Sequence, residues 1–173
     1  PYVPEENPCG AYIHHFVYEP NEAAPKAFLN FEGVDSCYYV WLNGSYVGYS
    51  QVSHSTSEFD VTPYIRAGEN KLAVLVLKWC DGSYLEDQDK FRMSGIFRDV
   101  YLLKRPEQGI FDYFLKTQTG EQQAQIDVTF SFFDEKMPVK CSVYDQEGNL
   151  AASAEGVPGE AGLSLTVERP VLW

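Results

Sequence analysis

The first part of the chain alternates apolar and polar residues with a period of two, which is the pattern of half-buried β-strands. Residues 11–18 alternate in this way with aromatic rings along one side, and residues 26–31 form a second apolar run after a proline-containing loop. Residues 71–79 differ, because their apolar side chains fall on both sides of the strand. A strand with two apolar faces is expected to lie centrally, between two layers.

The clearest predicted hairpin joins residues 38–42 to residues 45–49 through Asn43 and Gly44. A two-residue type I′ turn needs a positive φ at both positions, and Asn-Gly is the pair that adopts it most readily. Further along, Thr62 precedes a proline, a combination that predicts the N-cap of one short helical turn.

A carboxylate-rich stretch, WCDGSYLEDQDKFRMSGIFRDVYLL at residues 79–103, joins the central strand to a further apolar strand expected at 97–103. Its loop holds four carboxylates, which are Asp81, Glu86, Asp87 and Asp89. Carboxylates this dense between buried strands form either a solvated bulge or a place where something polar binds. From the residues alone the solvated bulge is favoured, because clustered charges usually face water.

The polar segment 104–109, which contains a proline and a glycine, predicts a domain boundary. The first domain is expected at 1–105 and the second at 109–173. In the second domain five short strands are predicted, at 110–116, 123–132, 139–144, 150–154 and 163–167. Short strands with regular turns favour a β-sandwich. An immunoglobulin-like sandwich needs about seven strands, so this domain is predicted to be incomplete.

Composition and charge narrow the possible partners. A content of 45% hydrophobic residues in 173 argues for a folded globular protein. The net charge of −12 argues against nucleic acid or an anionic membrane as a partner, and no apolar run reaches the length of about 20 residues that a spanning helix needs. The first residues lack the features of a signal peptide, so the chain is expected to start mid-sequence.

The four cysteines are far apart and show no CxxC spacing; they are Cys9, Cys37, Cys80 and Cys141. This argues against a metal or redox motif and favours free thiols in a reducing compartment, so a cytoplasmic location is predicted. His14, His15 and His54 lack metal-ligand spacing, and adjacent strand residues point to opposite faces.

Other polar residues of the carboxylate-rich stretch are interpreted as structural. Arg92 and Arg98 can each pair with a carboxylate, with Glu86 and Asp87 either solvated or partners of Arg92. Asp81 with its following glycine indicates a turn. Ser94 has no histidine–aspartate partner placed by the sequence, which argues against a nucleophile.

Five aromatic residues leave two interpretations open; they are Trp41, Tyr46, Tyr49, Trp79 and Tyr84. Aromatic faces suit the C–H side of sugars, so these rings are candidates for a carbohydrate-stacking platform. The favoured alternative is that they fill the sandwich core and the interface to neighbouring domains.

Three stretches together resemble one family; they are FEGVDSCYYVWLNGSYVGYSQ, SEFDVTPYIRAGENKLAVLVLKW and DGSYLEDQDKFRMSGIFRDVYLL. They are similar to the N-terminal jelly-roll domain of glycoside hydrolase family 2, and within it to the large β-galactosidases. The resemblance is close over residues 1–105 and looser over 106–173. It implies an all-β fold class, with a jelly-roll (galactose-binding-like) β-sandwich followed by a truncated immunoglobulin-like β-sandwich.

The resemblance also implies that catalysis is carried out by another domain of the enzyme. In that family two glutamates on a (β/α)₈ barrel, third in the chain, act as general acid/base and nucleophile and retain configuration at the sugar carbon. This chain is therefore expected to be a non-catalytic N-terminal fragment of a retaining β-galactosidase, with no catalytic residue and no activity alone. Its expected partners are the barrel of its own chain and a β-galactoside, in a parent enzyme that is a homo-oligomer.

Asp89, the last aspartate of LEDQD, matches the family residue that reaches into the active site, contacts the sugar hydroxyls and helps to hold a sodium ion. The resemblance thus implies that Asp89 binds substrate and sodium in the full-length protein, where an oxygen-rich site suits a hard cation. No cofactor is expected within the chain itself, while sodium, with magnesium as a second metal, is expected in the full-length enzyme. A free-standing carbohydrate-binding module and a structural interaction domain are the alternative functions.

Overall fold

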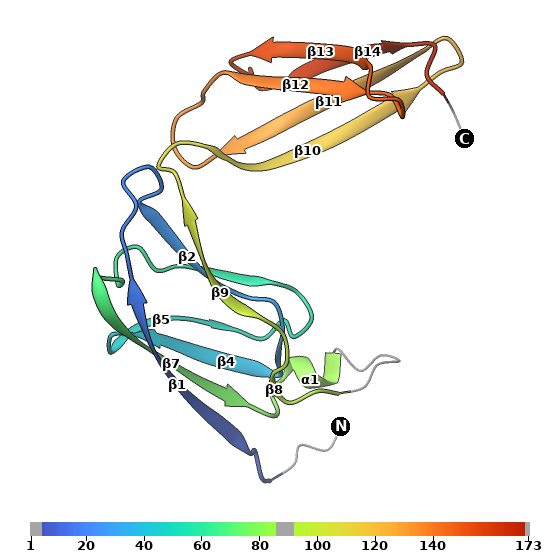
Figure 1. The fold of residues 1–173 in the computed structure, drawn as a ribbon. Coiled ribbons are helices and arrows are strands. Elements are labelled where there is room, and N and C mark those ends of the chain that lie inside the picture. Colours follow the sequence, from blue (N-terminus) through green and yellow to red (C-terminus); the bar gives the residue numbers. More distant parts are fainter. Residues whose placement is uncertain (1–4, 86–91, 172–173) are drawn as a thin grey trace. The chain divides into compact units, whose positions relative to one another are not determined.

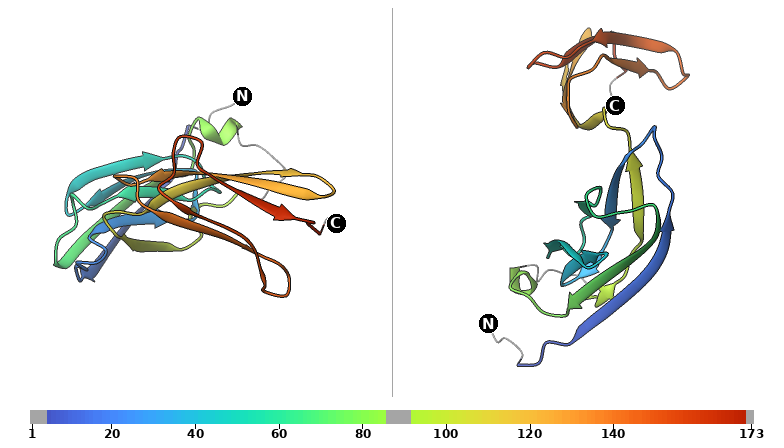
Figure 2. Two further views of the ribbon diagram at one scale, coloured as in Figure 1. Left: turned by 90° about the horizontal axis from the view of Figure 1, so that it is seen from above. Right: turned by 90° about the vertical axis from the view of Figure 1, so that its left-hand side faces the viewer.

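The computed structural model describes residues 5–85 and 92–171, and these form two compact units, Pro1–Pro106 and Glu107–Trp173. Both units are built from antiparallel strands, which confirms the predicted all-β class (Figure 1). Figure 2 shows from two further directions that α1 (Gly82–Leu85) is the one helical coil of the described residues. Among these residues no helix is long and apolar enough to cross a membrane.

Unit 1 is a jelly-roll β-sandwich of two main sheets and a short strand pair. The first sheet has the order β1 (Cys9–Tyr18), β7 (Gly68–Leu77), β4 (Cys37–Leu42) and β5 (Ser45–Ser50). The second has the order β6 (Ser57–Asp60), β2 (Lys26–Phe31) and β9 (Val100–Arg105). The short pair joins β3 (Val34–Asp35) to β8 (Gly95–Ile96).

The core of unit 1 comes from alternate residues of the central strands. Its largest buried rings, Phe31 on β2 and Tyr38 on β4, lie 4.8 Å apart between their centroids. On β7 the residues at 72, 74 and 76 are buried, whereas those at 73, 75 and 77 are half-buried. The prediction of a central strand is confirmed within the sheet, because β7 pairs with β1 on one side and with β4 on the other. The prediction of a layer on both faces is not confirmed, because the face with residues 73, 75 and 77 is only half-buried.

The two turns predicted in unit 1 have different outcomes. Asn43 and Gly44 have φ values of 53° and 86°, which confirms the hairpin between β4 and β5. The prediction that Thr62 is the N-cap of the short helical turn is wrong. Its Oγ1 accepts from the Ala27 N–H at 2.9 Å, while Asp60 Oδ1 accepts from the Thr62 N–H at 2.9 Å. Asp60 therefore caps the turn, and Thr62 ties it to β2.

The strand predicted at 97–103 starts three residues later, as β9, and residues 97–99 separate it from the short strand β8. Between them the chain changes partner, since the Phe97 N–H donates to the Gly33 carbonyl at 3.2 Å and Asp99 accepts from Glu32 at 3.1 Å. A Cβ at Gly33 would lie 2.8 Å from the Phe97 ring, so glycine makes this crossing possible.

Unit 2 is an immunoglobulin-like β-sandwich made of the five strands that the sequence predicts. One sheet has the order β10 (Ile110–Thr119), β11 (Gln123–Phe132) and β14 (Leu163–Glu168), and the other pairs β12 (Val139–Tyr144) with β13 (Leu150–Gly156). Its buried apolar side chains are few; they are Ala124, Val128, Val139, Pro158 and Leu165. Every residue of β10 is exposed.

Candidate functional site

The carboxylate-rich stretch begins in the structure with a helical turn. The strand β7 ends at Leu77, and α1 follows at Gly82–Leu85, where the sequence predicted only a turn at Asp81. Asp81 Oδ1 accepts from the Gly82 N–H at 2.9 Å, which is how the side chain starts this turn. Asp89, together with Glu86 and Asp87, lies outside the described residues, so its assigned role stays a prediction.

The two arginines of the stretch contact carbonyl oxygens and rings. The Arg92 guanidinium donates to the Ser83 carbonyl and lies 5.9 Å from the centroid of the Trp79 ring. Arg98 donates to the His54 carbonyl at 3.3 Å and lies 5.5 Å from the centroid of the Phe97 ring. Arg92 therefore joins the end of the stretch to α1, and Arg98 joins it to the loop that contains His54.

A chain of buried polar groups connects α1 to the sheets. The Ser83 hydroxyl donates to Ser36 Oγ at 2.9 Å and accepts from the Cys80 N–H at 3.1 Å. Ser36 Oγ lies 2.8 Å from Asp35 Oδ1 and 2.7 Å from the Lys78 carbonyl. The relative exposures of Asp35, Ser36 and Ser83 are 6%, 5% and 4%, so these groups satisfy one another away from water.

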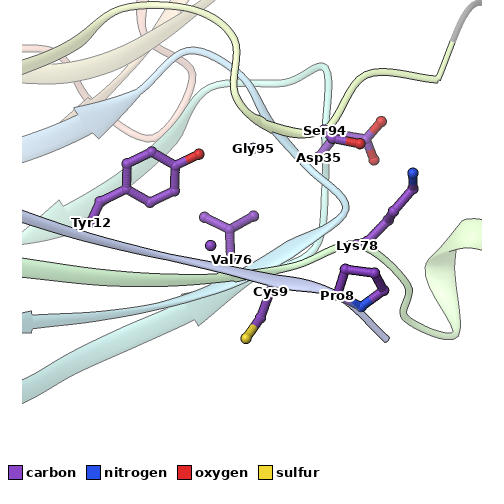
Figure 3. Close-up of a pocket in the computed structure, with 9 residues that line it drawn as sticks. Pro8, Cys9, Tyr12, Asp35, Val76, Lys78, Ser94 and Gly95 are labelled. Carbon is purple, nitrogen blue, oxygen red and sulfur yellow. The ribbon is translucent and has the colours of Figure 1, made fainter. Parts of the chain in front are cut away.

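A cavity of about 300 Å³ lies beside Asp35 (Figure 3). Its lining combines a carboxylate, an ammonium, two hydroxyls and small or apolar groups; the residues are Pro8, Cys9, Gly10, Tyr12, Asp35, Val76, Lys78, Ser94 and Gly95. In Figure 3 the Asp35 carboxylate and the Lys78 amine lie toward one end, away from the Tyr12 ring. Acceptors and donors side by side suit a hydroxyl-bearing group, and no histidine lines the described part of the cavity to activate Ser94.

Four aromatic rings pack together on the outer face of the first sheet. Tyr39 lies 4.9 Å from Tyr49 and 6.1 Å from Trp41, and Trp41 lies 5.8 Å from Tyr46, between ring centroids. Tyr46 is 51% exposed and Tyr49 is 39% exposed, so these two rings do not fill the core, while their place in an interface to neighbouring domains stays a prediction. Phe31 and Tyr38 fill it instead.

The described cysteines are free thiols that differ in burial. Cys37 is buried, and that burial raises the pKa of its thiol, which therefore stays protonated at neutral pH. The other cysteines are free as well, with Cys80 and Cys141 half-buried and Cys9 exposed. Within 5–85 and 92–171 there is no group of three or more metal-ligating side chains.

The fold defines a protein of two β-sandwich units. Comparison with known families identifies the family to which it belongs. The model of "Glycosyl hydrolases family 2, sugar binding domain" matches residues 1–106. Two β-galactosidases, from Staphylococcus xylosus and from Actinobacillus pleuropneumoniae, are each 45% identical to the chain over 175 residues. The chain belongs to glycosyl hydrolase family 2.

The matched relatives are much longer than this chain. All of the chain aligns with the Staphylococcus xylosus β-galactosidase but spans only 17% of its length. A Yersinia pestis β-galactosidase is 55% identical over 123 residues, which cover 70% of the chain and 12% of that protein. The chain therefore corresponds to a small part of the length of these β-galactosidases.

Solved structures support the fold. An FMN-binding β-glucuronidase from Facaelibacterium prausnitzii L2-6 superposes with a TM-score of 0.80 at 21% identity, covering 95% of this chain and 28% of that one. A β-glucuronidase from Ruminococcus gnavus gives a TM-score of 0.77 at 20% identity, covering 94% of this chain and 30% of that one. Sequence identities this low support a shared fold and give no information about the substrate.

Sequence reasoning did not find Ser36, Ser83 or Lys78 as site residues. A serine that follows a strand and a serine within an acidic loop have no spacing that marks them as partners, since they are separated by 47 residues. The periodicity of the strands indicates which residues face inward, but not which two loops meet at the end of the sandwich.

Proposed function

We propose that the chain is the N-terminal, non-catalytic part of a retaining β-galactosidase. The observation that carries this proposal is the 45% identity across the whole chain with a β-galactosidase six times as long, of which it spans 17%. Retaining hydrolysis needs a pair of carboxylates about 5–5.5 Å apart on either side of the glycosidic bond. In this proposal the remaining chain supplies that pair on a (β/α)₈ barrel, and unit 1 packs against the barrel.

Asp89 is the residue through which unit 1 takes part in binding. As in the family that the sequence resembles, its carboxylate accepts hydrogen bonds from the galactose hydroxyls and helps to hold sodium, while magnesium binds elsewhere in the full-length enzyme. A carboxylate is a suitable ligand for both, because it offers several acceptor positions and a negative charge. The described residues on either side, Ser83 and Arg92, anchor the chain at the two ends of this segment.

The parent enzyme is expected to be a homo-oligomer and to work in the cytoplasm. Four cysteines that are all free among the described residues are in keeping with a reducing compartment. The net charge of −12 suits a neutral sugar substrate better than a strongly anionic partner.

A second candidate is a free-standing carbohydrate-binding module. The observation that favours it is the row of outward aromatic rings, Tyr39, Trp41, Tyr46 and Tyr49, on the first sheet. A structural interaction domain is the third candidate, and the same apolar rings would then contact protein rather than sugar.

The three candidates are separated by two measurements. In the first, the longer protein and the 173-residue chain are assayed with nitrophenyl β-galactoside and nitrophenyl β-glucuronide. We expect the longer protein to hydrolyse the galactoside faster and the chain alone to show no turnover. Turnover by the purified chain contradicts the proposal, and so does a preference of the longer protein for the glucuronide.

In the second, galactose and lactose are titrated calorimetrically into the chain alone. The β-galactosidase proposal predicts no binding at millimolar concentration, because most of the sugar pocket belongs to the barrel. Millimolar or tighter binding that is lost in Trp41→Ala supports the module instead. If the chain binds no sugar and the longer protein shows no catalysis, the structural interaction domain is the remaining candidate.

A further inference from the structure

The cavity beside Asp35 contains a buried carboxylate that the protein satisfies only in part (Figure 3). Asp35 is 6% exposed, and its Oδ1 accepts from the Ser36 hydroxyl at 2.8 Å. In the ranges 5–85 and 92–171 no donor lies within hydrogen-bond distance of Oδ2. Oδ2 keeps contact with solvent, since Tyr38 Oη is the one polar side-chain atom of these ranges that is sealed without a partner. A buried carboxylate needs donors or positive charge, so this oxygen can receive a donor that enters the cavity.

A positive charge lines the same cavity without pairing with Asp35. The Lys78 amine and the Asp35 carboxylate lie at one end of the cavity, but no ion pair joins them in the described part of the chain (Figure 3). The Lys78 ammonium lies 5.6 Å from the centroid of the Trp79 ring, which supports it at the rim. The cavity therefore presents one negative and one positive group that are each accessible to a ligand.

The two charged residues belong to a frame that hydrogen bonds hold together. Ser36 Oγ lies 2.7 Å from the Lys78 carbonyl, and the Lys78 N–H donates to the Pro8 carbonyl at 3.0 Å. The Asn7 side chain donates to the Trp79 carbonyl and accepts from the Trp79 N–H, both at 2.9 Å. Three segments that are distant in the sequence thus fix the backbone around both charges before a ligand arrives, which lowers the entropic cost of binding.

The rest of the lining leaves room for a small ligand. Gly95 pairs with Asp35 between β8 and β3, and the Tyr12 hydroxyl lies so close to Gly95 that a Cβ there would collide with it. Gly10 is a second wall residue without a side chain, and Ser94 adds a hydroxyl at the rim. The volume of about 300 Å³ is at the lower limit for small-molecule pockets, so the cavity fits a ligand of few atoms.

We propose that this cavity binds a small zwitterion, an α-amino acid, whose ammonium pairs with Asp35 and whose carboxylate pairs with Lys78. A ligand with a single charge is attracted by one of these groups and repelled by the other, and a neutral sugar compensates neither charge. Both contacts are charge-assisted hydrogen bonds, which are roughly twice as strong as neutral ones. This site goes beyond the proposed function and does not depend on it.

Isothermal titration of glycine into the 173-residue chain tests the site. Glycine carries both charges, whereas glycinamide lacks the carboxylate and N-acetylglycine lacks the ammonium. We expect glycine to bind in the millimolar range, as suits so small a ligand, and each analogue to bind at least about tenfold more weakly. No heat of binding from glycine, or equal affinities for the three compounds, would overturn the inference.

Two variants and a matched control assign the binding to the two charges. Asp35→Asn and Lys78→Gln each remove one charge, and each is expected to weaken glycine binding at least about tenfold. Lys71→Gln removes an exposed charge from β7, the strand that ends just before Lys78, and should leave the affinity unchanged. Should Asp35→Asn fail to fold, the exposed Lys78 carries the test, because equal binding by Lys78→Gln and Lys71→Gln would contradict the proposal.

Amide chemical shifts of the isotope-labelled chain show where glycine binds. The largest changes are expected at the wall residues Cys9, Gly10 and Gly95, and changes confined to other parts of the chain would overturn the inference.

The glycine titration is then repeated with the longer protein. We expect the same affinity there, and a loss of binding would overturn the proposal by showing that another part of the enzyme fills the cavity. None of these readouts requires hydrolysis of a galactoside, so a failure of the proposed function is distinguishable from a failure of this site.

Discussion

The two units of this chain are made of the same kind of strand but bury it to very different extents. Phe31 on β2 of unit 1 is 1% exposed, whereas Phe114 on β10 of unit 2 is 69% exposed. The strand β10 is paired with β11 along its length, and yet all its residues are exposed. Pairing within a sheet is therefore not enough to make a core, because a sheet buries side chains only where a second layer faces it.

The largest expected difference in stability is between alanine substitutions of Phe31 and Phe114. Phe31→Ala leaves a cavity among Tyr38 and Phe59 and is expected to lower the free energy of unfolding of unit 1 by about 3–5 kcal/mol. Phe114→Ala removes an exposed ring and should change the free energy by less than about 0.5 kcal/mol. Urea denaturation of the chain measures both, and similar losses would contradict the difference in burial.

Two asparagines give the next contrast. The Asn70 amide is 1% exposed; it accepts from Asn43 and the Arg66 N–H and donates to the carbonyls of Arg66 and Gly68. Asn70→Ala leaves these partners unsatisfied and should lower the free energy of unfolding by about 2–3 kcal/mol. Asn149→Ala, at the exposed turn of unit 2, should lower it by less than about 1 kcal/mol. An equal effect of both in a thermal melt would show that burial does not set the difference.

A third prediction concerns Leu115, which is 51% exposed on β10. We expect unit 2 to be incomplete, so that further strands cover β10 in the longer protein. Leu115→Asp should then change the 173-residue chain by less than about 0.5 kcal/mol but lower the stability of the longer protein by about 2 kcal/mol, the value of one buried leucine. Denaturation of both proteins measures this, and an equally small effect in each would show that β10 stays uncovered.

The smallest expected effect is a pH dependence in the β12–β13 hairpin. Asn149 and the nearby backbone N–H groups donate to the Asp145 carboxylate and lower its pKa below the ordinary value of 3.8. A lowered pKa in the folded state means that the charged form stabilises the fold above pH 3.8. This stabilisation is lost as the pH falls through the lower, folded-state pKa.

Thermal melts of the wild type and of Asp145→Asn measure the stabilisation that the charged Asp145 carboxylate provides. The wild type should melt higher than the variant near pH 6, and its advantage should shrink when the pH is brought below 3.8. An advantage that stays constant with pH would contradict the assignment of the lowered pKa to the hydrogen bonds at this turn.

The strands could be predicted because their information is local. Alternation located β1, an apolar run located β2, and Asn43-Gly44 located a turn whose positive φ values few other pairs adopt. The split between β8 and β9 was missed, because it depends on Gly33 admitting the Phe97 ring from a distant part of the chain. Local pattern does not contain that contact.

The candidate site was harder to predict than the fold. The sequence marked the acidic stretch, and the family resemblance narrowed its function to Asp89. Neither indicated the bond between Ser36 and Ser83, because two serines 47 residues apart meet only once the sheets are assembled. The sequence also did not indicate that Tyr46 and Tyr49 lie outside the core, since an aromatic residue on a strand fits a core and an open face equally well.

The place of Asp89 in a galactoside pocket is tested most directly by the kinetics of Asp89→Asn in the longer protein, with Asp134→Asn, an exposed aspartate that follows β11, as control. We predict that Asp89→Asn lowers kcat/KM for nitrophenyl galactoside at least about tenfold and weakens its dependence on sodium, while Asp134→Asn changes neither. Unchanged kinetics and unchanged sodium dependence in Asp89→Asn would contradict the assignment.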